Sequence, residues 1–267
     1  MKFGYQIATH EVTKQKVTGL KGEYEALFAL IKDNGFTGVE FMVRNPFEID
    51  FDLLRRLTGS CGLDVPMFCT GEVYGEDGVS FASPDAKVRA EAMGRTIRLL
   101  REAETFGAHV NVGRLRGAYT PGVPPEDTLR WVRAGLLEAA RTRPGTKLLI
   151  EPIYRAYTNL ILTTQDGLRF VKELNAPNVG LMLDIDHMTL EGEDIPQSIR
   201  EAQGYFHHVH ICDTEHQCLG KGNYNFAEFL GALKSVNYSG YVTVETFPSE
   251  DQRAEVRESA RILRDWL

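Results

Sequence analysis

Short apolar segments alternate with longer amphipathic segments along the whole of this 267-residue chain. Each apolar segment has the length of a buried strand, and the segment after it has the spacing of a helix. We predict strands at Phe3–Ala8, Gly38–Val43, Val65–Cys69, Ala108–Val112, Lys147–Glu151, Val179–Asp184, Phe206–Ile211 and Tyr241–Glu245. Eight βα units of about 30 residues each are what a closed (β/α)8 TIM barrel requires.

The segments between the strands carry signals for the ends of helices. Ser83 is expected to cap a helix that begins at Pro84, and Gly35 and Gly107 are expected to end helices in left-handed turns. The predicted helices lie within residues 22–35, 51–58 and 83–107, at Pro125–Arg141, Gln165–Leu174, Ile195–Gln203 and Phe226–Val236, and from Asp251 to the C-terminus.

No linker, charge block or shift in composition divides the sequence. Residues 1–267 are therefore expected to form one α/β domain. A doubly wound open sheet is the rival fold, and it usually has a glycine-rich turn after its first strand. Here QIATHEVTKQK occupies that place, which favours the barrel.

The charge and the cysteines limit the kinds of partner and compartment. A net charge of -7 repels polyanions, so we expect no nucleic-acid partner. The four cysteines include no C-x-x-C pair and are too few for a disulfide scaffold. The N-terminus lacks the apolar core of a signal peptide, and no apolar run is long enough to span a membrane. We therefore expect a cytoplasmic protein without a membrane partner.

Acidic residues stand at the ends of three predicted strands. They are Glu151, Asp184 and Glu245, and His210 stands near the end of the strand between the last two. The four residues follow one another at intervals of about one βα unit, so they come from four consecutive strands. Strand ends converge at the catalytic end of a barrel, where three carboxylates require a cation to stay ionised together. We predict one divalent metal ion, with Mn²⁺ favoured and Mg²⁺, Co²⁺ or Zn²⁺ as alternatives.

Six stretches carry a resemblance to known proteins: VEFMVRNP, CTGEVYGEDGVSFASPD, IEPIYR, LDIDHM, HVHICD and VTVETF. In them the sequence resembles the xylose-isomerase-like sugar isomerases and epimerases, most closely the tagatose/psicose 3-epimerase and keto-gluconate epimerase types. The resemblance implies that Glu151, Asp184, His210 and Glu245 bind the metal and that the two glutamates also transfer protons. It further implies that His187 contacts substrate oxygens, and that the protein forms a homodimer or homotetramer.

Two positions depart from the family pattern and leave the substrate open. Tyr157 stands where an acidic substrate-binding residue is expected, and His216 stands where an arginine is expected. Both are kept as candidate substrate contacts, as are Glu72 and Arg114 near the ends of the third and fourth strands. Arg116 is a second candidate for holding an anionic group.

Three further features give weaker signals. Glu40 near the end of the second strand is expected either to reach the pocket or to form a surface ion pair. His207 and His208 are expected to serve packing or hydrogen bonding. The loop LGKGN at Leu219–Asn223 lies where barrels often bind phosphate, but two glycines and a lysine do not establish a phosphate site.

The predicted reaction is epimerisation or aldose–ketose isomerisation of a ketose or keto-sugar acid. One glutamate removes a proton beside the ketone, the metal stabilises the enediolate, and the other glutamate returns a proton. A dehydratase acting on a sugar or inosose is the alternative, because it would use the same metal and the same first step. A non-catalytic sugar-binding barrel is a weaker alternative. An abasic-site nuclease on this barrel is disfavoured by the acidic charge and the few histidines.

Overall fold

Eight parallel strands close into a barrel in which each strand pairs with its neighbours in the chain. The circle closes where β8 pairs with β1, for example at Phe3 and Val242. The strands are β1 (Lys2–Ala8), β2 (Gly38–Met42), β3 (Met67–Cys69), β4 (His109–Val112), β5 (Leu148–Ile150), β6 (Val179–Asp184), β7 (Phe206–Ile211) and β8 (Tyr241–Val244). This computed structural model describes residues 1–267, and the predicted TIM barrel is confirmed.

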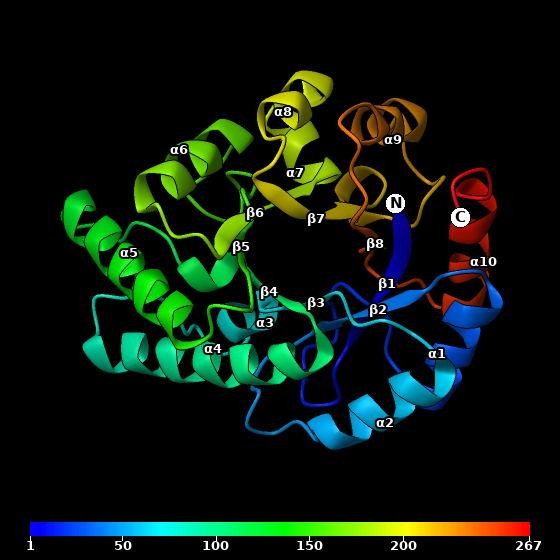
Figure 1. Cartoon of the computed structure of the whole chain (residues 1–267), viewed down its shortest axis with the longest axis horizontal. Coiled ribbons are helices and arrows are strands. Elements are labelled where there is room, and N and C mark those ends of the chain that lie inside the picture. Colours follow the sequence, from blue (N-terminus) through cyan, green and yellow to red (C-terminus); the bar gives the residue numbers. More distant parts are fainter.

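Helices surround the barrel on its outside (Figure 1). They are α1 (Tyr24–Asp33), α2 (Phe51–Cys61), α3 (Gly71–Gly75), α4 (Ala86–Phe106), α5 (Pro125–Thr142), α6 (Thr164–Leu174), α7 (Ile185–Leu190), α8 (Ile195–Glu201), α9 (Phe226–Ser235) and α10 (Gln252–Ile262). Two short 3-10 turns, η1 (Arg114–Arg116) and η2 (Thr214–His216), follow β4 and β7. Both turns, α3 and α7 were not predicted, because three to six residues are too few to show a helical period.

The predicted start of the long helix α4 is wrong by two residues. Asp85, not Ser83, is the N-cap, and its side chain accepts a hydrogen bond from the backbone N–H of Lys87. The Ser83 hydroxyl accepts instead from the N–H of Asp85. The carboxylate takes the capping position because it complements the positive end of the helix. Gly107 ends the helix in the left-handed conformation, as predicted.

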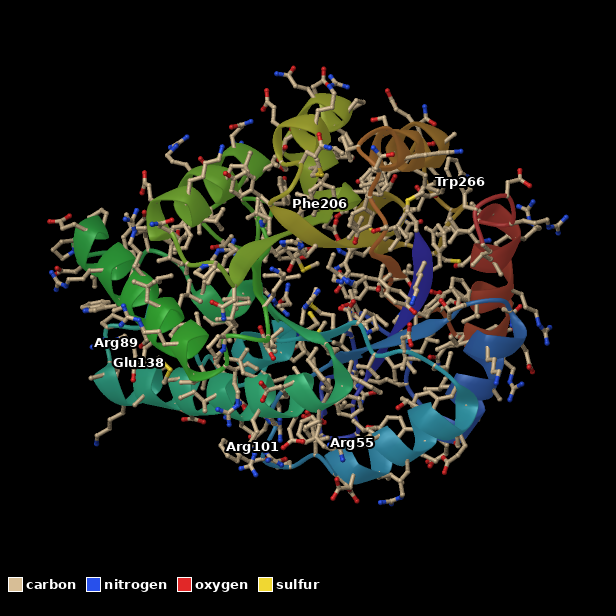
Figure 2. All side chains as sticks on the ribbon, in the orientation of Figure 1. Arg55, Arg89, Arg101, Glu138, Phe206 and Trp266 are labelled. Carbon is tan, nitrogen blue, oxygen red and sulfur yellow. The ribbon has the colours of Figure 1, made fainter.

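Buried side chains fill the interior of the barrel. Met67, Leu149 and Met182, from β3, β5 and β6, form a fully buried apolar cluster of their own, apart from the main core of 63 residues. Charged side chains such as Arg101 and Glu138 lie on the outer surface of the helices (Figure 2). No helix has the length and apolar character needed to cross a membrane.

Candidate metal centre and active site

Strand alternation directs the candidate ligands at the ends of β5, β6 and β7 into the barrel interior. Successive side chains on a strand point to opposite faces, so residues two apart share a face. Glu151 comes two residues after the interior residue Leu149, and Asp184 comes two after Met182. His210 is paired with Asp184 in the register of β6 and β7, so these two lie at the same height.

The predicted ligands lie together in a tight group. One ligand atom from each of Glu151, Asp184, His210 and Glu245 lies within 4.8 Å of the others. Nδ1 of His210 is 2.6 Å from Oε2 of Glu245 and 3.7 Å from both Oε1 of Glu151 and Oδ2 of Asp184. All four residues are buried, with at most 6% of the surface of any one exposed. We call these four residues the acid ring.

Each carboxylate of the acid ring has one oxygen held by the protein. Oε2 of Glu151 accepts from the Asn111 side-chain amide at 2.9 Å, and Oε1 of Glu245 accepts from the Thr18 hydroxyl at 2.8 Å. Oδ1 of Asp184 accepts from two backbone N–H groups at the start of α7. The opposite oxygen of each carboxylate is the one that faces His210. The ring is therefore oriented around a common centre by hydrogen bonds from outside.

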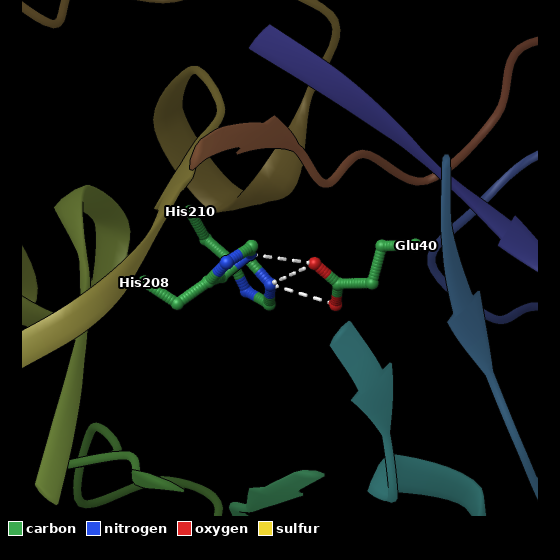
Figure 3. A group of neighbouring side chains, drawn as sticks. All are labelled: Glu40, His208 and His210. Atoms are coloured by element: carbon green, nitrogen blue, oxygen red, sulfur yellow. Dashed lines mark hydrogen bonds and ion pairs between the residues drawn. The ribbon is translucent and has the colours of Figure 1, made fainter. Parts of the chain in front are cut away.

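His210 is oriented by Glu40, which lies on β2 across the barrel (Figure 3). Nε2 of His210 is 2.9 Å from Oε1 of Glu40, and Nε2 of His208 is 2.8 Å from Oε2 of the same carboxylate. The Gln6 amide donates to Oε1 of Glu40 at 3.0 Å. Because Glu40 holds Nε2, the Nδ1 atom of His210 is left to face the ring, which is the usual arrangement of a metal-binding histidine.

Glu40 is expected from the sequence either to reach the pocket or to form a surface ion pair, and both expectations are wrong. Glu40 is fully buried, so it forms no surface ion pair, and it does not line the cavity. Sequence reasoning missed its role because its partners come from β7, 168 and 170 residues later in the chain. His208 does serve hydrogen bonding, as expected.

Burial and mutual repulsion dominate the electrostatics of the acid ring. Burial raises the pKa of Glu151 to about 7, and the carboxylates of Glu245 and Asp184 add to this rise while His210 opposes it. Burial also acts to lower the pKa of His210, but Glu245 and Glu40 outweigh burial and hold that pKa well above its usual range. A divalent cation would remove the repulsion among the carboxylates.

Two atoms of the ring support the fit of a cation directly. Oδ2 of Asp184 is buried and accepts no hydrogen bond, and Nδ1 of His210 forms none of regular geometry although it lies 2.6 Å from Oε2 of Glu245. Buried polar atoms without partners are costly in a folded protein. Three carboxylate oxygens and one imidazole nitrogen around one centre are a donor set for a hard or borderline divalent ion. The residues present therefore fit the predicted metal.

A cavity of about 360 Å³ opens beside the acid ring and includes all five predicted substrate contacts in its lining: Glu72, Arg114, Tyr157, His187 and His216. Nε2 of His187 lies 4.0 Å from Oε1 of Glu151. Tyr157 is 50% exposed at the mouth, with its ring centroid 6.1 Å from that of His187. Glu72 accepts from Arg114 at 2.7 Å. These placements are compatible with substrate contact for each of the five.

His216 reaches the edge of the acid ring because of the unusual backbone of η2. Glu215 and His216 both have left-handed backbone angles, with φ of 59° and 57°. Nδ1 of His216 is 3.0 Å from Oδ2 of Asp186, and Nε2 is 3.6 Å from both Asp184 and Glu245. This conformation is uncommon for residues other than glycine, and such outliers concentrate at functional sites.

The contacts of Arg116 and of the loop LGKGN argue against an anion-binding role for either. Arg116 is fully buried and donates to the backbone carbonyls of Gly113, Leu160 and Ile161, so it ties the loops after β4 and β5 together and holds no ligand. Beside the loop LGKGN, the carboxylate of Asp213 accepts from the N–H groups of Gly220 within the loop and of Thr214 and Tyr224 outside it. The position that a phosphate would take is filled by Asp213.

Comparisons with known proteins agree with the fold. The sequence profile of the family described as xylose isomerase-like TIM barrel matches residues 28–266. An L-ribulose 3-epimerase of Mesorhizobium japonicum is 29% identical over 235 residues, which are 86% of this chain and 77% of that protein. A 3-dehydro-D-guloside 4-epimerase of Escherichia coli is 28% identical over 260 residues, 89% of this chain and 92% of that protein.

A solved structure gives the same result for the backbone. The crystal structure of a D-allulose 3-epimerase from Methylomonas sp. matches with a TM-score of 0.82 at 20% identity, covering 100% of this chain and 97% of that chain. At this level of identity the likeness shows a shared fold and nothing about the substrate.

Proposed function

This chain belongs to the xylose isomerase-like TIM barrel family, and we propose that it is a divalent-metal-dependent epimerase of a ketose or keto-sugar acid. The predicted resemblance is confirmed, and so is the prediction of an isomerase, because the curated relatives described above are named epimerases. The metal and the homodimer or homotetramer remain predictions.

The observation that carries the proposal is the way the acid ring is held. Each of Glu151, Asp184, His210 and Glu245 has one polar atom fixed by a neighbour and another facing the shared centre. Ion pairs on a protein surface do not require that each residue has one atom fixed by a neighbour and another atom turned toward a common centre. We propose that these four residues hold one divalent ion, with Mn²⁺ favoured.

When bound, the ion would polarise the substrate ketone and stabilise the negative charge that develops beside it. Glu151 and Glu245 are the two bases of the proposed reaction. Both carboxylates line the cavity, so each can reach a substrate held there. One glutamate removes the proton from the carbon beside the ketone, and the other returns a proton from the opposite face.

Two side chains orient the glutamates, and a third is placed to contact the substrate. Asn111 and Thr18 fix the orientation of Glu151 and Glu245, so that little motion is needed during proton transfer. His187 lies between the cavity and Glu151 and is placed to hydrogen-bond a substrate oxygen. The buried setting excludes water that would compete for the proton.

The test is proton exchange with solvent. Protein loaded with Mn²⁺ is incubated in D₂O with a panel of ketoses and keto-sugar acids, and deuterium is followed at the carbons beside the carbonyl. We expect uptake at one carbon, with formation of the epimer at that carbon. Mass spectrometry of the product separates the reaction from a dehydration, because an epimer keeps the mass of the substrate apart from the deuterium.

Each alternative has its own outcome in this assay. Loss of one water from any substrate would identify a dehydratase. Tight Mn²⁺ binding without exchange on any member of the panel would contradict the epimerase and favour a sugar-binding barrel.

A further inference from the structure

Three cationic side chains line the cavity. Lys14 and Lys16 come from the loop between β1 and α1, and Arg114 comes from η1 after β4. We call these three residues the cationic wall. No sequence pattern marks the two lysines, because their loop has no periodicity or motif.

The cationic wall carries more positive charge than the protein neutralises. Glu72 is the one carboxylate that pairs with it: Arg114 donates to Oε1 at 2.7 Å, and the Lys14 amine lies 3.6 Å from Oε2. Lys16 forms no ion pair, and its amine lies 5.1 Å from the centroid of the Phe247 ring. The three cations share one carboxylate partner, so two positive charges of the cationic wall are not neutralised by ion pairs of their own.

The loop that carries the lysines is held in place. The Glu76 carboxylate accepts from the backbone N–H groups of Thr13 and Lys14, at 3.2 and 2.9 Å. Lys21 donates to the carbonyls of Val12 and Lys14. Farther along the same loop, Thr18 donates to Glu245 of the acid ring. The position of the lysines is therefore coupled to the candidate catalytic residues.

The usual place for an anion in a barrel of this kind is closed. That place is the loop after β7, and its N–H groups are already taken by Asp213. An anionic group on a substrate that enters the cavity can therefore be neutralised at the cationic wall and not at the β7 loop.

We infer that the substrate is an anionic sugar derivative, whose carboxylate or phosphate group binds Lys14, Lys16 and Arg114 while its ketone end lies at the acid ring. This inference rests on the proposed function for the identity of the reaction. It selects the keto-sugar acid or sugar phosphate over the neutral ketose, and it makes Lys16 a residue that determines specificity. Substitution of Lys16 gives the clearest test of anion binding, because Lys16 forms no ion pair with a carboxylate of the protein.

The first test compares turnover of matched substrates. Neutral ketoses, keto-sugar acids and ketose phosphates of equal chain length are assayed with the Mn²⁺-loaded protein and with Lys16→Gln. We expect kcat/KM to be highest for an anionic substrate and to fall about 10- to 100-fold for that substrate in Lys16→Gln, since a hydrogen bond to a charged group is lost. The neutral ketose should change by less than about twofold.

The control variant is Lys87→Gln, which removes the same charge from the exposed start of α4. It should leave kcat/KM unchanged for every substrate. Equal losses for neutral and anionic substrates in Lys16→Gln, or a preference of the unaltered protein for neutral ketoses, would overturn the inference. The acid and phosphate arms identify which anionic group the cationic wall prefers.

The second test needs no turnover, so it stands even if the proposed epimerase activity fails. Calorimetry of the Mn²⁺-loaded protein measures binding of a hexitol, the aldonate of the same chain length and the hexitol monophosphate. We expect an anionic ligand to bind more tightly than the hexitol, and Lys16→Gln to remove that advantage. Equal binding of the aldonate and of the phosphate to Lys16→Gln and to the unaltered protein would refute the proposed binding of the anionic group by Lys16.

Discussion

The two sides of the barrel mouth are built differently. The acid ring stands at the ends of β5 to β8, is almost fully buried and is held by hydrogen bonds from strands, from the start of α7 and from Thr18 in the loop after β1. The cationic wall stands on the loops after β1 and β4, with the side chains of Lys14 and Arg114 41% and 26% exposed. The residues proposed for chemistry therefore stand at strand ends of the sheet, whereas those proposed for specificity are carried on loops.

This division has a physical reason. Strand ends are positioned by the closed hydrogen-bonded sheet, so small errors of geometry at the reacting atoms are avoided. Loops can change sequence without disturbing the sheet, which allows one barrel to accept different substrates. The departures at Tyr157 and His216 fit the same pattern, because both residues lie on segments that follow strands.

The largest effect is expected from the two candidate bases in the acid ring. Glu151→Gln and Glu245→Gln should each lower kcat by about three orders of magnitude, because an amide cannot accept the substrate proton. Each change should also weaken Mn²⁺ binding, measured by calorimetry. Glu138→Gln on the outer surface of α5 is the matched control and should have normal activity. Near-normal turnover in either ring variant would contradict the proposed mechanism.

The next largest effect is expected from Glu40, which orients His210 of the acid ring. Glu40→Gln should weaken Mn²⁺ binding about 10- to 100-fold, because Gln keeps a hydrogen bond to His210 but loses the charge that makes its ring a strong ligand. His208→Gln removes the other imidazole on Glu40 and leaves the Glu40 contact with His210 intact. It should change the affinity for Mn²⁺ far less. Equal Mn²⁺ affinities in Glu40→Gln and the unaltered protein, with both folded by circular dichroism, would show that Glu40 does not support the metal site.

The affinity for metal should also depend on pH. Burial raises the pKa of Glu151 to about 7, so in the metal-free protein this carboxyl gains a proton as the pH falls through 7. The raised pKa of His210 acts in the same direction, since a protonated imidazole cannot bind a cation. The Kd for Mn²⁺ should therefore rise about tenfold or more from pH 7 to pH 6. A Kd that stays constant over this interval, measured by calorimetry, would contradict the assignment of Glu151 as a ligand.

The smallest expected effect is a difference in salt dependence between the cationic wall and the acid ring. Raising sodium chloride from about 0.05 M to about 0.5 M should lower kcat/KM for an anionic substrate about threefold, because exposed charges are screened. The kcat at saturating substrate should change little, because the buried acid ring is shielded from salt. A neutral ketose serves as the control. Equal salt dependence for neutral and anionic substrates would contradict the proposal that the cationic wall binds the anionic group of the substrate.

Much of this site could be predicted because the barrel converts sequence spacing into position. Glu151, Asp184, His210 and Glu245 recur once per βα unit, and the closed sheet brings their strand ends together. Glu40 could not be assigned in the same way. A carboxylate on β2 is compatible with a surface, a pocket or a buried partner, and only the closure of the barrel places it against β7.

The sequence by itself determined the fold class, the order of the strands and the four members of the acid ring, because alternation and the βα repeat are local properties of the chain. Only the tertiary structure decided which atom of each ring residue is held and which faces the centre. It also decided that Arg116 is structural, that Asp213 fills the β7 loop, and that Lys14, Lys16 and Arg114 share one cavity. These facts depend on contacts between distant segments, which no local pattern records.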